Sequence, residues 1–211
     1  MILKFWKKYS YMLLFAFVVA GLFDLRIALA AIVCMLAPIG FALVGKGRFW
    51  CGNICPRGNF YDNIIGKISR HKSVPRILKS PIFRFAVITF MFYMFGTGLA
   101  KSWGSLADMG MVFYRIIVIT TVVGIALSPF YHERTWCNFC PMGSISAFIS
   151  SFKKDKKVLK VSSACVSCKL CQKKCPMGIV PYDYKGDVLS HPDCIQCSKC
   201  VNVCPKDAIG Y

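Results

Sequence analysis

The sequence predicts a membrane-embedded α-helical domain of four helices, arranged as two hairpins, followed by a small cysteine-rich domain. Two observations support this fold class. Of the 211 residues, 56% are hydrophobic, and the mean hydropathy of +0.53 is too high for an ordinary soluble domain. Twelve of the thirteen cysteines fall into short motifs, and eight of these twelve lie within residues 165–204. We expect a membrane domain at 1–150, a basic linker at 151–160 and the cysteine-rich domain at 161–211.

Apolar runs define the expected membrane spans. Residues 11–44 are apolar except for Asp24 and Arg26. As one helix they would be about 50 Å long, which exceeds the roughly 30 Å hydrocarbon core of a bilayer. We therefore divide the run at residues 23–26. The four expected spans are residues 5–23, 27–45, 81–100 and 111–130.

The distribution of basic residues predicts the orientation. Between the second and third spans there is one acid, Asp62, and there are eight cations: Lys46, Arg48, Arg57, Lys67, Arg70, Lys72, Arg76 and Lys79. Such a loop is expected on the cytoplasmic side, so both termini and all cysteine motifs should face the cytoplasm of a bacterium or archaeon. The net charge of +18 does not indicate nucleic-acid binding, because the basic residues flank apolar runs and no nucleic-acid motif accompanies them.

The C-terminal cysteines form two runs, CVSCKLCQKKCP from Cys165 and CIQCSKCVNVCP from Cys194. Each run has the spacing C-x2-C-x2-C-x3-C-P, which is typical of cluster ligands in two-cluster ferredoxins. Structural zinc also takes four thiolates at such spacings. It is the weaker interpretation, because a zinc ribbon does not need the third cysteine or the C-P ending.

The run from Cys165 to about Ile209, including the ending CPKDAI, resembles bacterial ferredoxins that carry two 4Fe-4S clusters. The resemblance implies a small α+β domain. It also implies crossed ligation, in which the fourth cysteine of each run binds the other cluster. Cluster I would take Cys165, Cys168, Cys171 and Cys204. Cluster II would take Cys194, Cys197, Cys200 and Cys175.

The membrane domain holds a third set of cysteines in two similar motifs, RFWCGNICPRG from Arg48 and RTWCNFCPMG from Arg134. Each motif follows a predicted hairpin, so this domain is an internal repeat. The four thiolates can then converge, and we favour a third 4Fe-4S cluster over a 2Fe-2S cluster or two separate sites. Covalent haem is disfavoured, because prolines occupy the histidine position of C-x-x-C-H. The four cysteines are Cys51, Cys55, Cys137 and Cys140.

Several further residues are candidates for a functional role. Arg48 and Arg134 are either arginines at the membrane edge or donors beside a negatively charged cluster. Any coupling of electron transfer to proton transfer needs a titratable group near a cluster, although ordinary loop positions are the simpler interpretation of these residues. The candidates near the C-P motifs are His71, His132, Asp62 and Glu133.

Two hairpins, each ending in a C-x2/3-C-P motif, followed by a two-cluster module, resemble the NapH and MauN family of ferredoxin-type membrane proteins, with relatives in the NosR and CcoG groups. The resemblance implies an electron-transfer subunit of quinol dehydrogenase type, rather than a stand-alone enzyme. Its partners would be menaquinol or ubiquinol and other redox subunits or soluble carriers. The chain departs from the family in its short outer loops and in having one C-x2-C motif in place of C-x3-C. An accessory protein that senses redox state, reduces a metal or assists assembly of another enzyme is the alternative.

Overall fold

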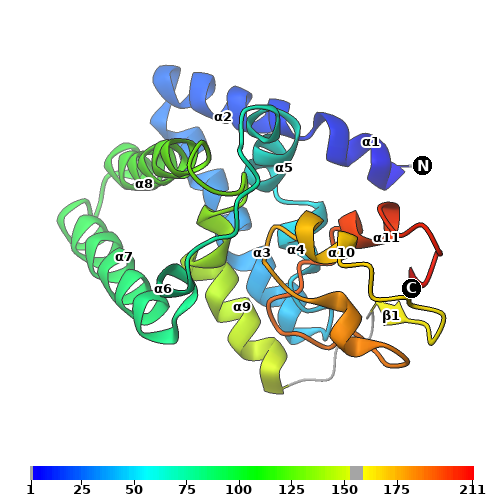
Figure 1. Ribbon diagram of the computed structural model, residues 1–211. Helices are drawn as coiled ribbons and strands as arrows, with labels where there is room; N and C mark the ends of the chain where they lie inside the picture. The colour runs from blue at the N-terminus through cyan, green and yellow to red at the C-terminus, as the bar shows by residue number, and fades with distance from the viewer. Residues whose placement is uncertain (1, 153–158) are drawn as a thin grey trace.

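The computed structural model describes residues 2–152 and 159–211 (Figure 1). The chain begins with helices α1 (Ile2–Tyr9) and α2 (Tyr11–Phe23). A 3-10 helix, η1 (Leu25–Ala30), then leads into α3 (Ala31–Leu43). Asp24 separates α2 from η1, because its backbone is extended and its side chain accepts a hydrogen bond from the Arg26 amide at 2.9 Å. The helix therefore ends within the expected break at residues 23–26.

The first expected span, residues 5–23, is not one continuous helix. The chain turns at Ser10, and α2 has 13 residues, which gives about 20 Å at 1.5 Å per residue and is shorter than a bilayer core. The α1 segment carries Lys4, Lys7 and Lys8. Lys7 donates a hydrogen bond to the Cys197 carbonyl oxygen at 3.3 Å, so α1 lies against the C-terminal module.

Helices α7 (Pro81–Lys101) and α8 (Leu106–Leu127) form the second hairpin. Serine N-caps begin both helices: the Ser80 and Ser105 side chains accept hydrogen bonds from the amides of Phe83 and Asp108. Among the described residues, three helical segments are long and apolar enough to cross a membrane: residues 25–43, 81–101 and 106–127. The α2 segment is apolar but shorter, so the four-span arrangement stays a prediction.

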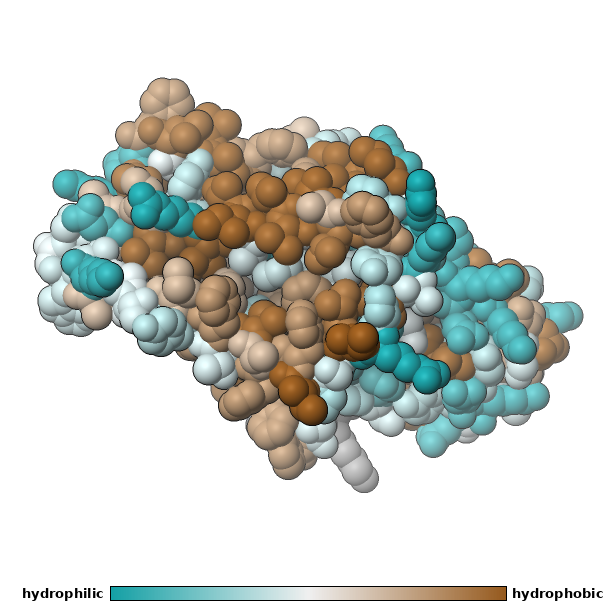
Figure 2. All heavy atoms as spheres, turned by 60° about the vertical axis from the view of Figure 1, so that its left-hand side comes forward, coloured by the Kyte–Doolittle hydropathy of each residue, from teal (hydrophilic) through white to brown (hydrophobic). Residues whose placement is uncertain are grey.

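Apolar side chains cover the outside of these helices. In α7, whose residues are all described, no side chain is buried, and Ile82, Phe85 and Phe90 are more than 60% exposed. Figure 2 shows hydrophobic residues gathered over the middle of the molecule, with hydrophilic residues at both ends and most of them at the right. Such a large exposed apolar surface is expected of a protein that lies in a bilayer.

Short helices at one end of the long helices carry the two C-P motifs. The first motif forms α4 (Phe49–Asn53) and α5 (Pro56–Asn63), and the second forms η3 (Trp136–Asn138) and α9 (Pro141–Phe152). In both motifs the proline is the first residue of the following helix, a position where its missing N–H costs nothing. Helix α5 packs against α2, and α9 packs against α3. The remaining short helices between α5 and α7 are η2 (Ile65–Lys67) and α6 (Arg76–Lys79).

The C-terminal module is a small α+β unit. Strand β1 (Lys160–Val161) pairs antiparallel with β2 (Ile209–Gly210), and between them lie α10 (Leu170–Lys174), η4 (Pro181–Tyr184) and α11 (Lys199–Asn202). Its core contains Leu159, Val161, Ile179, Leu189, Ile195 and Ile209. Of the expected basic linker, residues 153–158 lie outside the described residues.

Candidate metal centres

Two cavities in the C-terminal module divide its eight cysteines into two groups of four. Cys165, Cys168, Cys171 and Cys204 line the first cavity, together with apolar residues that include Val166, Tyr182 and Ile209. Cys175, Cys194, Cys197 and Cys200 line the second cavity, together with apolar residues that include Leu159, Ile179 and Leu189. In each cavity the fourth cysteine comes from the other run. Four thiols around an apolar hollow are the donor set that a 4Fe-4S cluster takes.

The loops around both cavities share one backbone conformation. Ser167 and Lys169, on either side of Cys168, have φ values of 52° and 64°, and Gln196 and Ser198, on either side of Cys197, have 51° and 65°. Left-handed backbone at non-glycine residues is uncommon and must be held by its surroundings. Its repetition at equivalent positions shows that both C-x2-C-x2-C runs wrap their cavities in the same way.

The four cysteines of the membrane motifs form a third group. Burial raises the pKa of the Cys51 thiol to about 12, and the charges of Cys55, Cys140 and Cys137 add to the rise. The pKa of Cys137 is likewise raised by burial, with contributions from Cys140 and Cys55. These mutual effects indicate that the four thiols lie near one another, although the two motifs that supply them are more than 80 residues apart.

Each motif's arginine reaches across to the other motif. Arg48 donates from Nη2 to the carbonyl oxygen of Cys137 at 2.7 Å, and Arg134 donates from Nη1 to the carbonyl oxygen of Cys51. Arg48 is 1% exposed and Arg134 is 0% exposed, so both guanidinium groups are buried within the protein. Both guanidinium groups oppose the rise in thiol pKa: Arg48 lowers the pKa of Cys51, and Arg134 lowers that of Cys137. They therefore favour the thiolate form that a metal requires.

A carboxylate pairs with each of these buried arginines. Arg48 contacts Asp193 of the C-terminal module at 3.0 Å. Arg134 holds both oxygens of Asp62, from Nε at 3.0 Å and from Nη2 at 2.6 Å. Burial alone would raise the pKa of both carboxyl groups, but the facing arginines outweigh it and hold the two pKa values below their usual range. The arginines are thus charged and paired, as buried charges must be.

Arg57 is a third arginine at this group, and the sequence indicated only that it belongs to a basic loop. It donates from Nη2 to the Cys140 sulfur at 3.5 Å and from Nη1 to the Thr120 hydroxyl in α8 at 2.8 Å. Its guanidinium lies over the Trp136 ring, 5.6 Å from the ring centre. The only sign of this role in the sequence is the position of Arg57. It directly follows the Cys-Pro pair of the first motif, where the second motif has Met142.

The membrane motifs contact the C-terminal module at the second cavity. Asn53, in the first motif, donates to the Gln196 carbonyl oxygen at 3.2 Å, and Asn138, in the second, donates to the Pro176 carbonyl oxygen at 3.4 Å. Gln196 and Pro176 both line the second cavity. The approach is so close that a Cβ atom on Gly52 would lie 1.8 Å from the Ile195 carbonyl oxygen.

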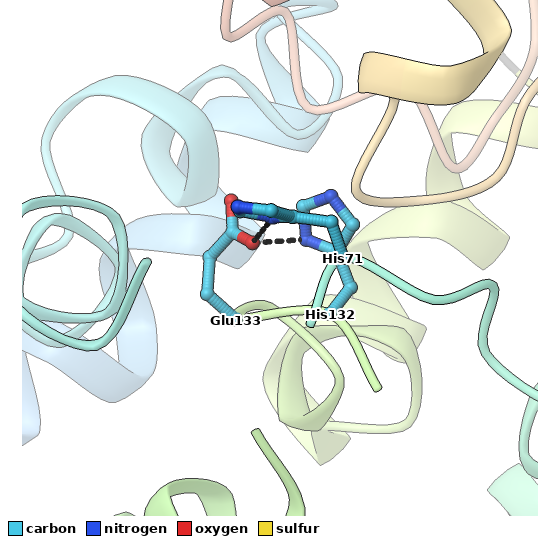
Figure 3. A group of neighbouring side chains, drawn as sticks. All are labelled: His71, His132 and Glu133. Carbon is cyan, nitrogen blue, oxygen red and sulfur yellow. Dashed lines mark hydrogen bonds and ion pairs between the residues drawn. The ribbon is translucent and has the colours of Figure 1, made fainter. Parts of the chain in front are cut away.

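The four candidate proton-transfer residues also lie together. Lys199 joins Asp62 to Glu133, with its Nζ atom 2.8 Å and 2.6 Å from their carboxylate oxygens. The other oxygen of Glu133 meets His71 and His132 (Figure 3). Sequence proximity to the C-P motifs indicated these residues singly but gave no sign that they would meet.

Comparison with known proteins identifies iron-sulfur domains in both parts of the chain. Residues 27–75 and 114–158, which contain the two C-P motifs, match the 4Fe-4S binding domain family, and residues 164–209 match the 4Fe-4S dicluster domain family. The chain contains ferredoxin-type 4Fe-4S domains. The expectation of iron-sulfur clusters is thereby confirmed at the level of the domain, while the number of clusters and the place in the NapH and MauN family stay predictions.

Three relatives match most of the chain. Two are uncharacterised proteins of Methanocaldococcus jannaschii, MJ0749 and MJ0750, each 27% identical over 87% and 90% of this chain and 71% and 82% of their own lengths. The third, from Escherichia coli K12, bears the name "Putative electron transport protein YccM" and is 25% identical over 89% of this chain and 59% of its own length. No solved structure matches the chain.

Proposed function

We propose that this protein is a membrane-bound iron-sulfur electron-transfer protein. It would pass electrons between the membrane quinone pool and a redox partner, as a NapH/MauN-type subunit of a quinol dehydrogenase-type complex. The 4Fe-4S domains and the printed name of the E. coli relative support electron transfer. The three apolar helices support a place in the membrane.

The proposal assigns three ligand sets. The cysteines that line the first cavity would hold cluster I, those that line the second cavity would hold cluster II, and Cys51, Cys55, Cys137 and Cys140 would hold a third cluster, preferably 4Fe-4S. When bound, each such cluster supplies a one-electron carrier whose potential depends on hydrogen bonds, charge and solvent exposure. At the third site, Arg48, Arg57 and Arg134 offset the negative charge of four thiolates, which should raise its potential.

One observation carries the proposal: the third group of cysteines lies directly against the loops of the second cavity. Gly52 lies next to Cys51 in the sequence and has no room for a side chain against the Ile195 carbonyl, and Ile195 follows Cys194. Electrons would then pass from the third site to cluster II and on to cluster I. This path leads from the helices that would cross the membrane to the outer part of the ferredoxin module. A protein that only needed structural clusters would not require this order.

The proposal also places the clusters on the cytoplasmic side. The loop that holds the first motif is strongly basic, and the positive-inside rule assigns such loops to the cytoplasm. Arg84, at the start of α7, supports a fixed position for the module beside this loop, because it donates from both Nη atoms to Asp193 at 2.9 and 3.0 Å.

Reconstitution in liposomes tests the proposal. The purified protein would be mixed with menaquinol in the bilayer, and cluster reduction would be followed optically and by EPR. We expect menaquinol to reduce the clusters of the wild type but not those of Cys51→Ala. Dithionite should still reduce the ferredoxin clusters of Cys51→Ala. If menaquinol reduces the clusters no faster than background, quinol oxidation is excluded, and the accessory or redox-sensing role becomes the better description.

A further inference from the structure

Two loops that are distant in the sequence bring a carboxylate and two imidazoles together. His71 lies in the loop between η2 and α6, and His132 and Glu133 lie in the turn between α8 and η3. A hydrogen bond from the Ser69 hydroxyl to the Tyr131 carbonyl oxygen, 2.9 Å long, joins the two loops beside these three side chains. Figure 3 shows the two rings and the carboxylate pointing toward one another.

The ligand atoms of this group converge on one point. His71 Nδ1 lies 3.0 Å from Glu133 Oε2, and His132 Nδ1 contacts the same oxygen. One ligand atom from each of the three residues lies within 4.8 Å of the other two. His132 and Glu133 are 5% and 2% exposed, whereas the His71 side chain is 48% exposed and leaves one side of the group open to solvent.

One carboxylate oxygen holds the two imidazole rings of the group. The buried Nδ1 atom of His132 contacts Glu133 Oε2, the oxygen that His71 Nδ1 meets at 3.0 Å. His71 has a φ of 52°, in the left-handed region, a conformation that its surroundings must hold. An ion bound by both rings and the carboxylate would help to hold it.

We infer that His71, His132 and Glu133 form a mononuclear site for a divalent transition-metal ion, separate from the cysteine sites. Two imidazoles and one carboxylate on one face suit borderline ions such as Zn²⁺ or Fe²⁺, rather than Mg²⁺ or Ca²⁺, which take oxygen ligands. If an ion lay about 2.1 Å from each ligand atom, the 3.0 Å separation of His71 Nδ1 and Glu133 Oε2 would give an N–ion–O angle of about 90°. That angle fits two neighbouring positions of an octahedron, and the shorter contact of His132 Nδ1 with the same oxygen must lengthen when an ion binds. The remaining positions would be open to water on the His71 side.

The surrounding charges determine how firmly this site would hold an ion. Lys199 and Arg134 balance Glu133 and Asp62 before any ion binds. A divalent ion would therefore add charge that no neighbouring carboxylate compensates, so the ion should be exchangeable rather than permanently held. The ion would tie the loops at His71 and His132 together. Through Glu133 and Lys199 it would also adjoin the loop of Cys200 in the ferredoxin module.

Zinc binding by the full-length, cluster-loaded protein tests the inference. The protein would be dialysed against EDTA and then against increasing Zn²⁺, and zinc per chain would be measured by mass spectrometry beside iron and acid-labile sulfide. We expect about one zinc per chain. Glu133→Gln and His71→Asn should weaken its binding at least tenfold, and Asn is chosen because it tolerates left-handed backbone.

His191→Gln is the matched control, because His191 is the remaining histidine of the three in the chain and accepts a hydrogen bond from the Asp193 amide in the ferredoxin module. Its zinc binding should equal that of the wild type. Unchanged sulfide content in every variant excludes binding to cysteines freed from lost clusters. If Glu133→Gln does not keep its clusters, zinc binding by His71→Asn decides the test, because His71 is half-exposed. No stoichiometric zinc in the wild type, or wild-type affinity in His71→Asn, would overturn the inference.

Discussion

Arg48 of the first C-P motif donates a hydrogen bond from Nη2 to the carbonyl oxygen of Cys137 in the second motif, at 2.7 Å. Arg134 makes the reciprocal contact with the carbonyl oxygen of Cys51. The two motifs are therefore bound by an exchange of arginines, and displacing either guanidinium should disturb cysteines on both sides. Glycines make this exchange possible, since the ideal Cβ of Gly58 would lie 2.8 Å from Arg134 Nη1 and that of Gly143 2.5 Å from Arg48 Nη2.

The first prediction concerns these glycines. Gly58→Ala and Gly143→Ala should each displace a buried guanidinium and lower the iron content by up to about four per chain, the content of one cubane. Gly58 is the more severe position, because its new Cβ would also lie 2.9 Å from the Cys51 carbonyl oxygen. Iron analysis and EPR of the reduced protein measure the loss, which should leave the ferredoxin signals in place.

Gly66→Ala is the control for this prediction. The nearest atom to its added Cβ is the Tyr61 carbonyl oxygen at 3.5 Å, an ordinary contact. Its iron content should match that of the wild type. Equal iron in Gly58→Ala and Gly66→Ala would show that the arginine exchange does not support the third site.

The second prediction separates the thirteenth cysteine from the other twelve. Cys34 in α3 lies near Cys55 and Arg57 but is not assigned as a ligand, so Cys34→Ala should keep all iron. Cys51→Ala and Cys140→Ala should lose about four irons per chain, because a cubane is lost when a ligand is missing. Quantitative iron and sulfide analysis distinguishes these results. Full iron content in Cys51→Ala would rule out the third cluster.

The sequence predicted more about the cysteines than about what surrounds them. The repeated R-x-W-C and C-P-x-G pattern indicated that the two motifs would meet. In the structure, the side chains of Arg48 and Arg134 each bond a backbone carbonyl of the other motif. The pattern did not reveal that the arginines would cross, because a local motif carries no information about which carbonyl 80 residues away will accept the bond. In the sequence, the glycine of C-P-x-G was the only feature that reflected the packing of the arginines.

Other features depended on contacts that no periodicity encodes. Asp193 in the ferredoxin spacer pairs with Arg48 and Arg84 of the membrane domain, and such a long-range pair cannot be found from spacing. The expected span at residues 5–23 ran through the turn at Ser10, although Lys7 and Lys8 precede that turn. Helix α1 instead follows its polar contacts, with Trp6 donating to the Ile54 carbonyl oxygen and Lys7 donating to that of Cys197.

The third prediction tests the crossed assignment of ligands. Cys175 belongs to the first run but lines the second cavity with Cys194, Cys197 and Cys200. Cys175→Ala should therefore alter the EPR signal of cluster II, while Cys204→Ala should alter that of cluster I. The spectra of Cys194→Ala and Cys165→Ala supply the references. A spectrum of Cys175→Ala that matches Cys165→Ala would show that each run binds its own cluster.

The fourth prediction concerns the contact between Gly52 and Ile195. An added Cβ would meet the Ile195 carbonyl oxygen at 1.8 Å and its carbonyl carbon at 2.8 Å. Because both atoms belong to the backbone, the loop of the second cavity must move. Such overpacking typically costs about 1–3 kcal/mol, which corresponds to a fall of several degrees in Tm for a chain of this size.

The shift should also slow electron transfer, because it separates the third site from cluster II. In liposomes, Gly52→Ala should keep its iron and be reduced by dithionite normally, yet menaquinol should reduce its ferredoxin clusters more slowly than those of the wild type. Gly210→Ala in β2 is the control, since no atom lies within 4 Å of its added Cβ. A lower Tm with an unchanged menaquinol rate would mean that electrons do not pass through this contact.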